Sequence, residues 1–389
     1  MPQESYWGAF EGGRAVAQLY AHDWTLGGGV AGCRLAAVSG VGTLPEFRRL
    51  GLLRTMMSIL FKDMMKNGQH VAALNATQAA IYQRYGYSEG VRNCRSYAID
   101  TVDVRFQDGD PGSYAVGREV LDKALEPTLR RLHEKYIDGR AGCLAWDSPN
   151  KGNSTATTLL SDEGFSKSSP PVYCAVARND EGKAKGYCLY TTQSGWGANA
   201  VDHPTRSQRL TVSEFVWEDI NSYRSIWTFL ATMHDLVGEI SVQKVPPDDP
   251  ATSIFLEPRL LRTKLQREGS WWRIVDVKGA LGHRRYNTIG GNTLAIAVLD
   301  DERLAPWNTG TWRITVNTSG VPTVDKIHGS VELAEVSVGI AELASLWSGA
   351  VTALQLHQWG LLKSSDNDAL LKASTMFAMP KSPFCFRGW

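Results

Sequence analysis

The chain has 389 residues, which is more than one domain usually holds, so two or three domains are expected. It carries 41 lysines and arginines against 40 aspartates and glutamates, and this balance gives no electrostatic reason to expect nucleic acid or an anionic membrane as the main partner. No apolar stretch is long enough to span a bilayer, and the first residues do not read as a signal sequence, so a cytoplasmic location is expected.

The first third of the chain alternates between strand and helix patterns. Residues 52–65 place apolar side chains at helical spacing and end at Asn67-Gly68, which predicts a helix. Apolar runs bounded by glycine-rich turns predict the strands. The expected order is strands at 6–10, 15–25 and 34–43, the helix at 52–65, a strand at 71–74, a short helix at 78–84 and a strand pair at 95–105.

Residues 37–54 join a predicted strand to the start of the predicted helix. The first N–H groups of a helix have no intrahelical partner, and the helix dipole places a partial positive charge beside them. Arg48, Arg49 and Arg54 add charge, and Gly51 lets a pyrophosphate approach the backbone without meeting a Cβ. The pattern indicates an anion cradle, although similar joints with arginines also occur on plain protein surfaces.

The order Arg-Arg-x-Gly-Leu-Leu after a strand resembles the acetyl-CoA pyrophosphate loop of the GNAT acetyltransferases. Arg48 and Gly51 fill the first and fourth places of that pattern, and Leu53 stands where many members have Gly or Ala. The longer version, Leu-Pro-Glu-x-Arg-Arg-x-Gly-Leu-Leu-Arg, is similar to the Eis (enhanced intracellular survival) subfamily, and a second block at residues 73–87 agrees with it. The resemblance implies an acetyl-CoA-dependent N-acetyltransferase that acts directly on a primary amine of a small molecule, aminoglycoside-like or another polyamine.

The same resemblance implies where acetyl-CoA binds. The strand residues before the loop would pair with the pantetheine like an added strand and direct an N–H at the thioester carbonyl. Thr77 also has a structural alternative, as the N-cap of the following helix. The implied cofactor-binding residues are Val41, Gly42, Thr43, Arg48, Arg49, Leu50, Gly51, Leu52, Leu53, Arg54, Thr77 and Gln78.

Two residues are implied to be catalytic. Tyr82 matches the tyrosine that protonates the departing CoA sulfur in this family, and its reference pKa of about 10 suits a thiol. The alternative role of Tyr82 is packing in an aromatic cluster with Tyr85 and Tyr87.

Eis-type chains end in an aromatic residue whose α-carboxylate acts as general base. The resemblance implies this role for Trp389, and the alternative is a frayed tail. Gly388 stands where aminoglycoside-acetylating relatives carry an acidic residue.

The fold class implied is α+β with three domains. GNAT domains begin with a strand and two helices before the strand placed at 6–10, so the first domain, residues 1–107, is expected to be N-terminally shortened and to lack the usual acceptor walls. Residues 113–268 resemble a second, degenerate GNAT-like domain without the arginine loop, and no second cofactor site is expected there. Residues 271–389 resemble a sterol-carrier-like domain that ends in the active site.

Elements are also expected in these later domains. The second is expected to hold a helix at 119–136, strands at 172–176, 184–192, 209–217 and 239–242, and a helix at 220–236, after a turn-rich linker at 108–112. The third is expected to hold strands near 292–298, 310–317 and 328–335 and helices near 338–347 and 351–358. A lipid carrier and a structural lid are the two interpretations of the third domain.

Cofactor and partner expectations follow. Six cysteines, at positions 33, 94, 143, 174, 188 and 385, show no metal-like spacing with the eight histidines, so free thiols and no metal are expected. The resemblance implies a homo-oligomer, in relatives a hexamer. A non-catalytic acyl-CoA or lipid-binding protein, and an enzyme that uses a donor other than acetyl, are the alternative hypotheses.

Overall fold

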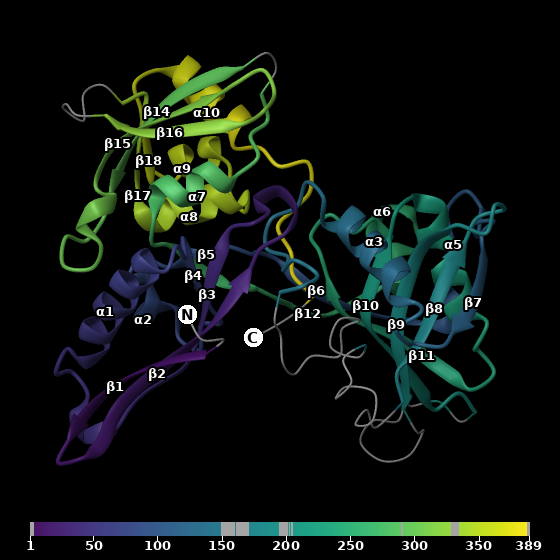
Figure 1. The fold of residues 1–389 in the computed structure, drawn as a ribbon. Coiled ribbons are helices and arrows are strands. Elements are labelled where there is room, and N and C mark those ends of the chain that lie inside the picture. The colour runs from purple at the N-terminus through teal and green to yellow at the C-terminus, as the bar shows by residue number, and fades with distance from the viewer. Residues whose placement is uncertain are drawn as a thin grey trace.

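The computed structural model describes residues 4–148, 160, 171–193, 201, 203, 205–288, 291–327 and 334–386. Within them the strands form three sheets, and helices pack against each sheet (Figure 1). The expected α+β class is confirmed. None of the helices in these ranges is both long enough and apolar enough to cross a membrane.

The first sheet has six strands in the order β1-β2-β3-β4-β13-β5. Its first three strands are antiparallel neighbours, and β3 and β4 run parallel. Its elements, with the two helices of the same segment, are β1 (Glu4–Glu11), β2 (Arg14–Thr25), β3 (Arg34–Thr43), α1 (Leu52–Lys66), β4 (Val71–Leu74), α2 (Ala79–Gln83), β5 (Ser88–Glu89) and β13 (Trp271–Ile274). The strands and helices expected up to residue 84 are thus confirmed.

Both faces of this sheet are covered. One face, with Leu74 and Trp271, packs on the buried side of α1, where Met57 and Leu60 are fully enclosed. The other face, with Ala73 and Trp272, packs against the third unit. Burial on both faces explains why β4 is a continuous apolar run rather than an alternating one.

The second unit contains a seven-stranded sheet in the order β12-β6-β11-β10-β9-β8-β7. Helix α3 covers one face and α5 the other, and each contributes its apolar side to a separate core cluster. The elements are β6 (Cys94–Asp100), β7 (Ala115–Glu119), α3 (Glu126–Ile137), β8 (Tyr173–Arg178), β9 (Ala184–Gln193), β10 (Gln208–Trp217), α5 (Ile220–Ala231), β11 (Val237–Val245), α6 (Ala251–Ile254) and β12 (Arg262–Arg267).

Two strands lie in other sheets than their sequence order suggested. The strand pair expected at 95–105 is the single strand β6, and it pairs with β11 and β12 rather than with the first sheet. Trp271, expected to begin the third unit, instead opens β13, which pairs with β4 and β5. Each strand is half-apolar or fully apolar and fits either sheet, so only long-range pairing decides between them.

The third unit is built on a five-stranded sheet in the order β16-β15-β14-β17-β18. The helices expected near 338–347 and 351–358 are confirmed as α8 and α9, whereas most of the strand expected at 328–335 lies outside the described residues. The elements are α7 (Val277–His283), β14 (Asn292–Leu299), β15 (Gly310–Val316), β16 (Pro322–Ile327), β17 (Val336–Gly339), α8 (Ile340–Ser348), α9 (Ala353–Gln358), β18 (Leu362–Ser364) and α10 (Asn367–Met376).

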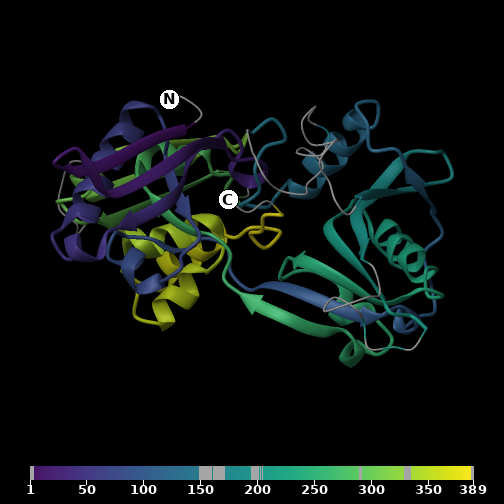
Figure 2. The same cartoon turned by 90° about the horizontal axis from the view of Figure 1, so that it is seen from below.

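A tail after α10 leaves the third unit and reaches the second, as the yellow trace in Figure 2 shows. The Phe384 N–H donates to the Ala141 carbonyl at 3.0 Å, and Lys244 Nζ donates to the Phe386 carbonyl at 2.6 Å. Both phenylalanines are buried, and their rings lie 4.8 Å apart between centroids. The aromatic tail is therefore anchored up to residue 386.

Candidate functional site

Strand β3 contains a bulge and pairs with β4 only over its first part. Gly40 has a φ of +59°, and the register with β2 shifts between Gln18 and Tyr20, so two residues of β3 oppose one of β2. A bulge with a left-handed glycine bends its strand. Pairing between β3 and β4 covers only three residues on each side and stops at Ala37. The segment from residue 38 to residue 43 consequently has β2 on one side and no strand partner from β4 on the other.

The loop after β3 leads to an uncapped helix start. Residues Pro45–Phe47 form a short 3-10 turn, Arg49 and Gly51 both have left-handed φ angles, and α1 begins at Leu52. Among the described residues no side chain caps α1, and its first turn contains no acidic residue. A Cβ built at Gly51 would meet no atom within 4 Å. Free N–H groups, a helix dipole and open space at the backbone fit an anionic group such as a pyrophosphate.

The three arginines of this loop differ in their surroundings. Arg48 and Arg49 are exposed, and Arg48 Nε lies 3.4 Å from the Thr43 carbonyl oxygen. Arg54 is tied to the third unit, because its Nη1 donates to Asp301 Oδ2 at 2.7 Å. Arg303 also binds this carboxylate, and the hydrogen bonds from Arg303 and Arg54 hold the pKa of Asp301 at about 2. Arg54 therefore also connects α1 to the third unit.

The other cofactor-binding residues predicted from the sequence border the same segment. Leu50 is exposed, whereas Leu52 and Leu53 pack partly against the first core. Val41, Gly42 and Thr43 form the end of β3 beyond the bulge. Helix α2 begins at Ala79 with Gln78 at its N-cap and no side-chain capping bond, so the alternative role of Thr77 as N-cap is wrong.

Tyr82 lies on α2 in the first core. It keeps 7 % of its surface exposed, whereas Tyr87, whose ring stands edge-on 6.0 Å away, is fully enclosed. Burial, and secondarily the neighbouring Tyr85, raises the pKa of Tyr82. The phenol consequently keeps its proton at neutral pH and can serve as an acid, while it also packs as the core interpretation expected.

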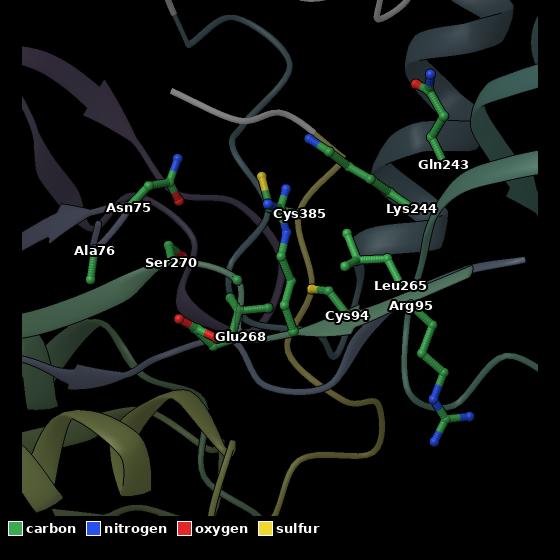
Figure 3. Close-up of a pocket in the computed structure, with 13 residues that line it drawn as sticks. Asn75, Ala76, Cys94, Arg95, Gln243, Lys244, Leu265, Glu268, Ser270 and Cys385 are labelled. Atoms are coloured by element: carbon green, nitrogen blue, oxygen red, sulfur yellow. The ribbon is translucent and has the colours of Figure 1, made fainter. Parts of the chain in front are cut away.

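A cavity of about 420 Å³ opens beside the end of β4 (Figure 3). Asn75 and Ala76, which directly follow β4, form one side, and residues from β6, β11 and the segment around β12 form the other. The lining residues are Asn75, Ala76, Val91, Cys94, Arg95, Gln243, Lys244, Leu265, Arg267, Glu268, Gly269, Ser270 and Cys385. The cavity thus lies between the first and second units.

The cavity also receives the C-terminal tail. Cys385 is one of its lining residues, and Lys244 holds the neighbouring carbonyl of Phe386. The predicted general base, Trp389, and Gly388 lie outside the described residues. The catalytic role of the terminal carboxylate therefore stays a prediction.

Sequence reasoning missed most of this cavity. Gln243, Lys244 and Arg267 belong to strands with unremarkable patterns, and Glu268 follows one of them. Trp271 and Trp272, on the neighbouring strand β13, are buried in two separate cores. These residues come together because β6 pairs with both β11 and β12. The apolar pattern of a single strand does not reveal its pairing partners.

Family models match three parts of the chain. One described as an acetyltransferase (GNAT) domain matches residues 1–90, and a second with the same description matches residues 156–274. One described as a sterol carrier protein domain matches residues 277–386. The three matches follow the order in which the three units were expected.

Curated relatives resemble the chain over most of its length. An uncharacterised N-acetyltransferase of Streptomyces coelicolor is 27% identical over 370 residues, which cover 94% of this chain and 83% of the relative. The N-acetyltransferase Eis of Mycobacterium tuberculosis is 27% identical over 345 residues, which cover 88% of this chain and 78% of the relative.

Solved structures agree with the fold. Eis1 from Mycobacterium abscessus superimposes with a TM-score of 0.75 at 26% identity, over 99% of this chain and 90% of that one. A GCN5-related N-acetyltransferase from Anabaena variabilis superimposes with a TM-score of 0.79 at 21% identity, over 99% of this chain and 89% of that one.

Proposed function

We infer that this chain, an acetyltransferase built of two GNAT domains and a sterol carrier protein domain, transfers the acetyl group of acetyl-CoA directly to the primary amine of a small molecule. The observation that carries this proposal is the opening of β3 from β4 between an uncapped helix start and the cavity at Asn75. An extended donor fits such a segment, with its anionic pyrophosphate at the helix start and its thioester toward the cavity.

The proposed donor site uses the chain as follows. The first turn of α1 and the exposed Arg48 and Arg49 would bind the pyrophosphate. The free edge of β3, from residue 41 to 43, would hold the pantetheine by backbone hydrogen bonds and direct an N–H at the thioester carbonyl. Gly42 supports this role, because a Cβ there would meet no atom within 4 Å and the approach is open.

The proposed transfer needs one acid and one base. The amine nitrogen forms a bond to the acyl carbon while the carbon–sulfur bond breaks, and the electron pair leaves on sulfur. Tyr82 gives its proton to that sulfur, and a base removes the proton from the nitrogen. The Trp389 carboxylate is the predicted base, and a chain with one residue added after Trp389 would test it by moving the carboxylate.

Release of thiol from acetyl-CoA in the presence of a panel of amines tests the proposal. Tyr82→Phe should keep acetyl-CoA binding, because the ring and its packing remain, and should lower kcat by about 10²-fold or more. Tyr87→Phe is the matched control on the same aromatic pair and should leave kcat unchanged. Binding of acetyl-CoA without transfer to any amine would contradict the proposal and favour a non-catalytic binding protein.

The assembly state is a separate proposal. A homo-oligomer is expected from the resemblance, and light scattering of the purified chain at several concentrations would test it. A mass of one chain at every concentration would contradict it.

A further inference from the structure

The charges of the cavity beside β4 are unevenly distributed. Lys244 and Arg267 both line it, and Glu268 is the carboxylate among its lining residues. In Figure 3, Lys244 extends from β11 toward Cys385, whereas Glu268 points the other way, toward Ala76. Arg95 also lines the cavity, but its side chain runs away from Lys244 in the same view.

Strand register brings the two cations together. In the order β12-β6-β11, Arg267 pairs with Cys94, and the next residue of β6, Arg95, pairs with Val245. Lys244 and Arg267 are therefore on the two strands that flank β6, near the same end of the sheet. Neighbouring strands lie about 4.8 Å apart, so β12 and β11, with β6 between them, lie about 10 Å apart, a gap that long lysine and arginine side chains can bridge to reach one small anion.

Neither cation is neutralised by the described residues. Lys244 Nζ donates to the Phe386 carbonyl at 2.6 Å, which uses one of its three N–H groups. Within the described ranges, no carboxylate forms an ion pair with Lys244 or Arg267. Burial lowers the pKa of Lys244. Cys385 and Cys94 oppose this shift, the charge of Arg267 adds to it, and Glu214 opposes it. A bound anion would favour the charged form of the ammonium group.

We propose that the acceptor is an amine that also carries an anionic group, a carboxylate or a phosphate, which Lys244 and Arg267 bind while the amine lies toward Glu268 and the end of β4. This inference rests on the proposed acetyl transfer and deepens it by naming the class of acceptor. It also sets this cavity against polycationic acceptors, because two cations that form no ion pair with a described carboxylate repel a second ammonium group at their end of the cavity.

Matched amines test the charge preference. 4-Aminobutanoate, butylamine and 1,4-diaminobutane have the same chain length and differ in the charge at the far end, and 2-aminoethyl phosphate against ethanolamine gives the phosphate counterpart. The wild type should show kcat/KM at least about tenfold higher for 4-aminobutanoate or for 2-aminoethyl phosphate than for its uncharged partner, as one charge-assisted contact would give. The larger of the two kcat/KM ratios shows whether the cavity prefers a carboxylate or a phosphate.

Substitutions separate recognition from a structural effect. Lys244→Met and Arg267→Met should each lower kcat/KM for the anionic amines about tenfold more than they lower kcat/KM for butylamine. Lys264→Met is the matched control on β12, since Lys264 Nζ lies 3.4 Å from Glu239 and does not line the cavity. It should change neither value.

Two results would overturn the inference while leaving acetyl transfer intact. One is a preference for 1,4-diaminobutane, and the other is an equal loss for all amines in Lys244→Met and Arg267→Met, which would mean that these cations anchor the chain's own tail. If the wild type acetylates no amine, the proposed function fails instead. Calorimetric binding of 4-aminobutanoate and butylamine to the protein with CoA then tests the inference by itself, and equal binding of the two overturns it.

Discussion

Gly40 forms the bulge in the part of β3 that has no partner in β4. Its φ is +59°, and a Cβ built there would lie 2.1 Å from Tyr20 Cε1 and 2.5 Å from Tyr20 Cδ1. Gly40→Ala therefore meets two separate obstacles, the left-handed backbone and the ring of Tyr20. We expect the bulge to be lost or distorted in this variant.

The magnitude follows from these two obstacles. An L-residue in the left-handed region costs about 1–2 kcal/mol. Overpacking against a ring that must shift costs about 1–3 kcal/mol. Together they predict a loss of roughly 2–5 kcal/mol in the free energy of unfolding if the bulge is kept. If β3 instead straightens to relieve the strain, stability recovers in part, and the unpaired edge that we propose for the donor is lost.

Urea unfolding and calorimetric titration with acetyl-CoA measure the two consequences. Gly117→Ala is the matched control in a strand, because a Cβ there meets no atom within 4 Å and its φ is not left-handed, so its unfolding free energy should stay within about 0.5 kcal/mol of the wild type. The double variant Gly40→Ala/Tyr20→Ala removes the clash and keeps the backbone strain. A Gly40→Ala variant as stable as the Gly117→Ala control, with an unchanged Kd for acetyl-CoA, would refute the reasoning.

Three further outcomes are expected. Gly42→Ala should leave the unfolding free energy nearly unchanged but weaken acetyl-CoA binding in the same titration, since the space that its Cβ enters is open without the donor. Tyr87→Phe should raise the unfolding free energy by about 1 kcal/mol, because the Tyr87 hydroxyl is buried with no partner among the described residues. Asp301 has its pKa lowered from 3.8 to about 2 by Arg303 and Arg54, so its contribution to stability is complete above about pH 4 and lost as the pH falls toward 2. The free energy of unfolding of Asp301→Asn, measured in urea across that pH range, should therefore lie below that of the wild type at pH 5 and approach it near pH 2.

The strand and the helix of the proposed donor site could be predicted from the sequence because they are contiguous. The strand, the turn, Gly51 and the helix occupy residues 34–66, and their signals are apolar periodicity and glycine placement, which act over short separations. The bulge at Gly40 was not predicted. A glycine within a strand indicates either a bulge or a close approach, and only the position of Tyr20 decides between them.

Strands β6 and β13 lie in other sheets than expected because local sequence patterns do not determine which strands pair. The sequence of β13 shows only that it is apolar and does not show which sheet it joins. In the structure it belongs to the first sheet: Trp271 pairs with Leu74 and packs on one face, and Trp272 packs on the other. A continuous apolar strand is compatible with any sheet that is covered on both sides. Partner choice then depends on contacts some 200 residues away, about which periodicity carries no information.

The acceptor side depends on that same kind of choice. Lys244 and Arg267 line the same cavity because β6 lies between β11 and β12, with Cys94 opposite Arg267 and Arg95 opposite Val245. Had β6 closed the first sheet, as the sequence order suggested, β11 and β12 would have lacked the strand that joins them, and the two cations would have had no common cavity. The strand that sequence reasoning placed in the wrong sheet is therefore the one that brings both cations to the cavity, and the preference that we propose for an anionic amine rests on the topology of the second unit rather than on the acetyltransferase loop.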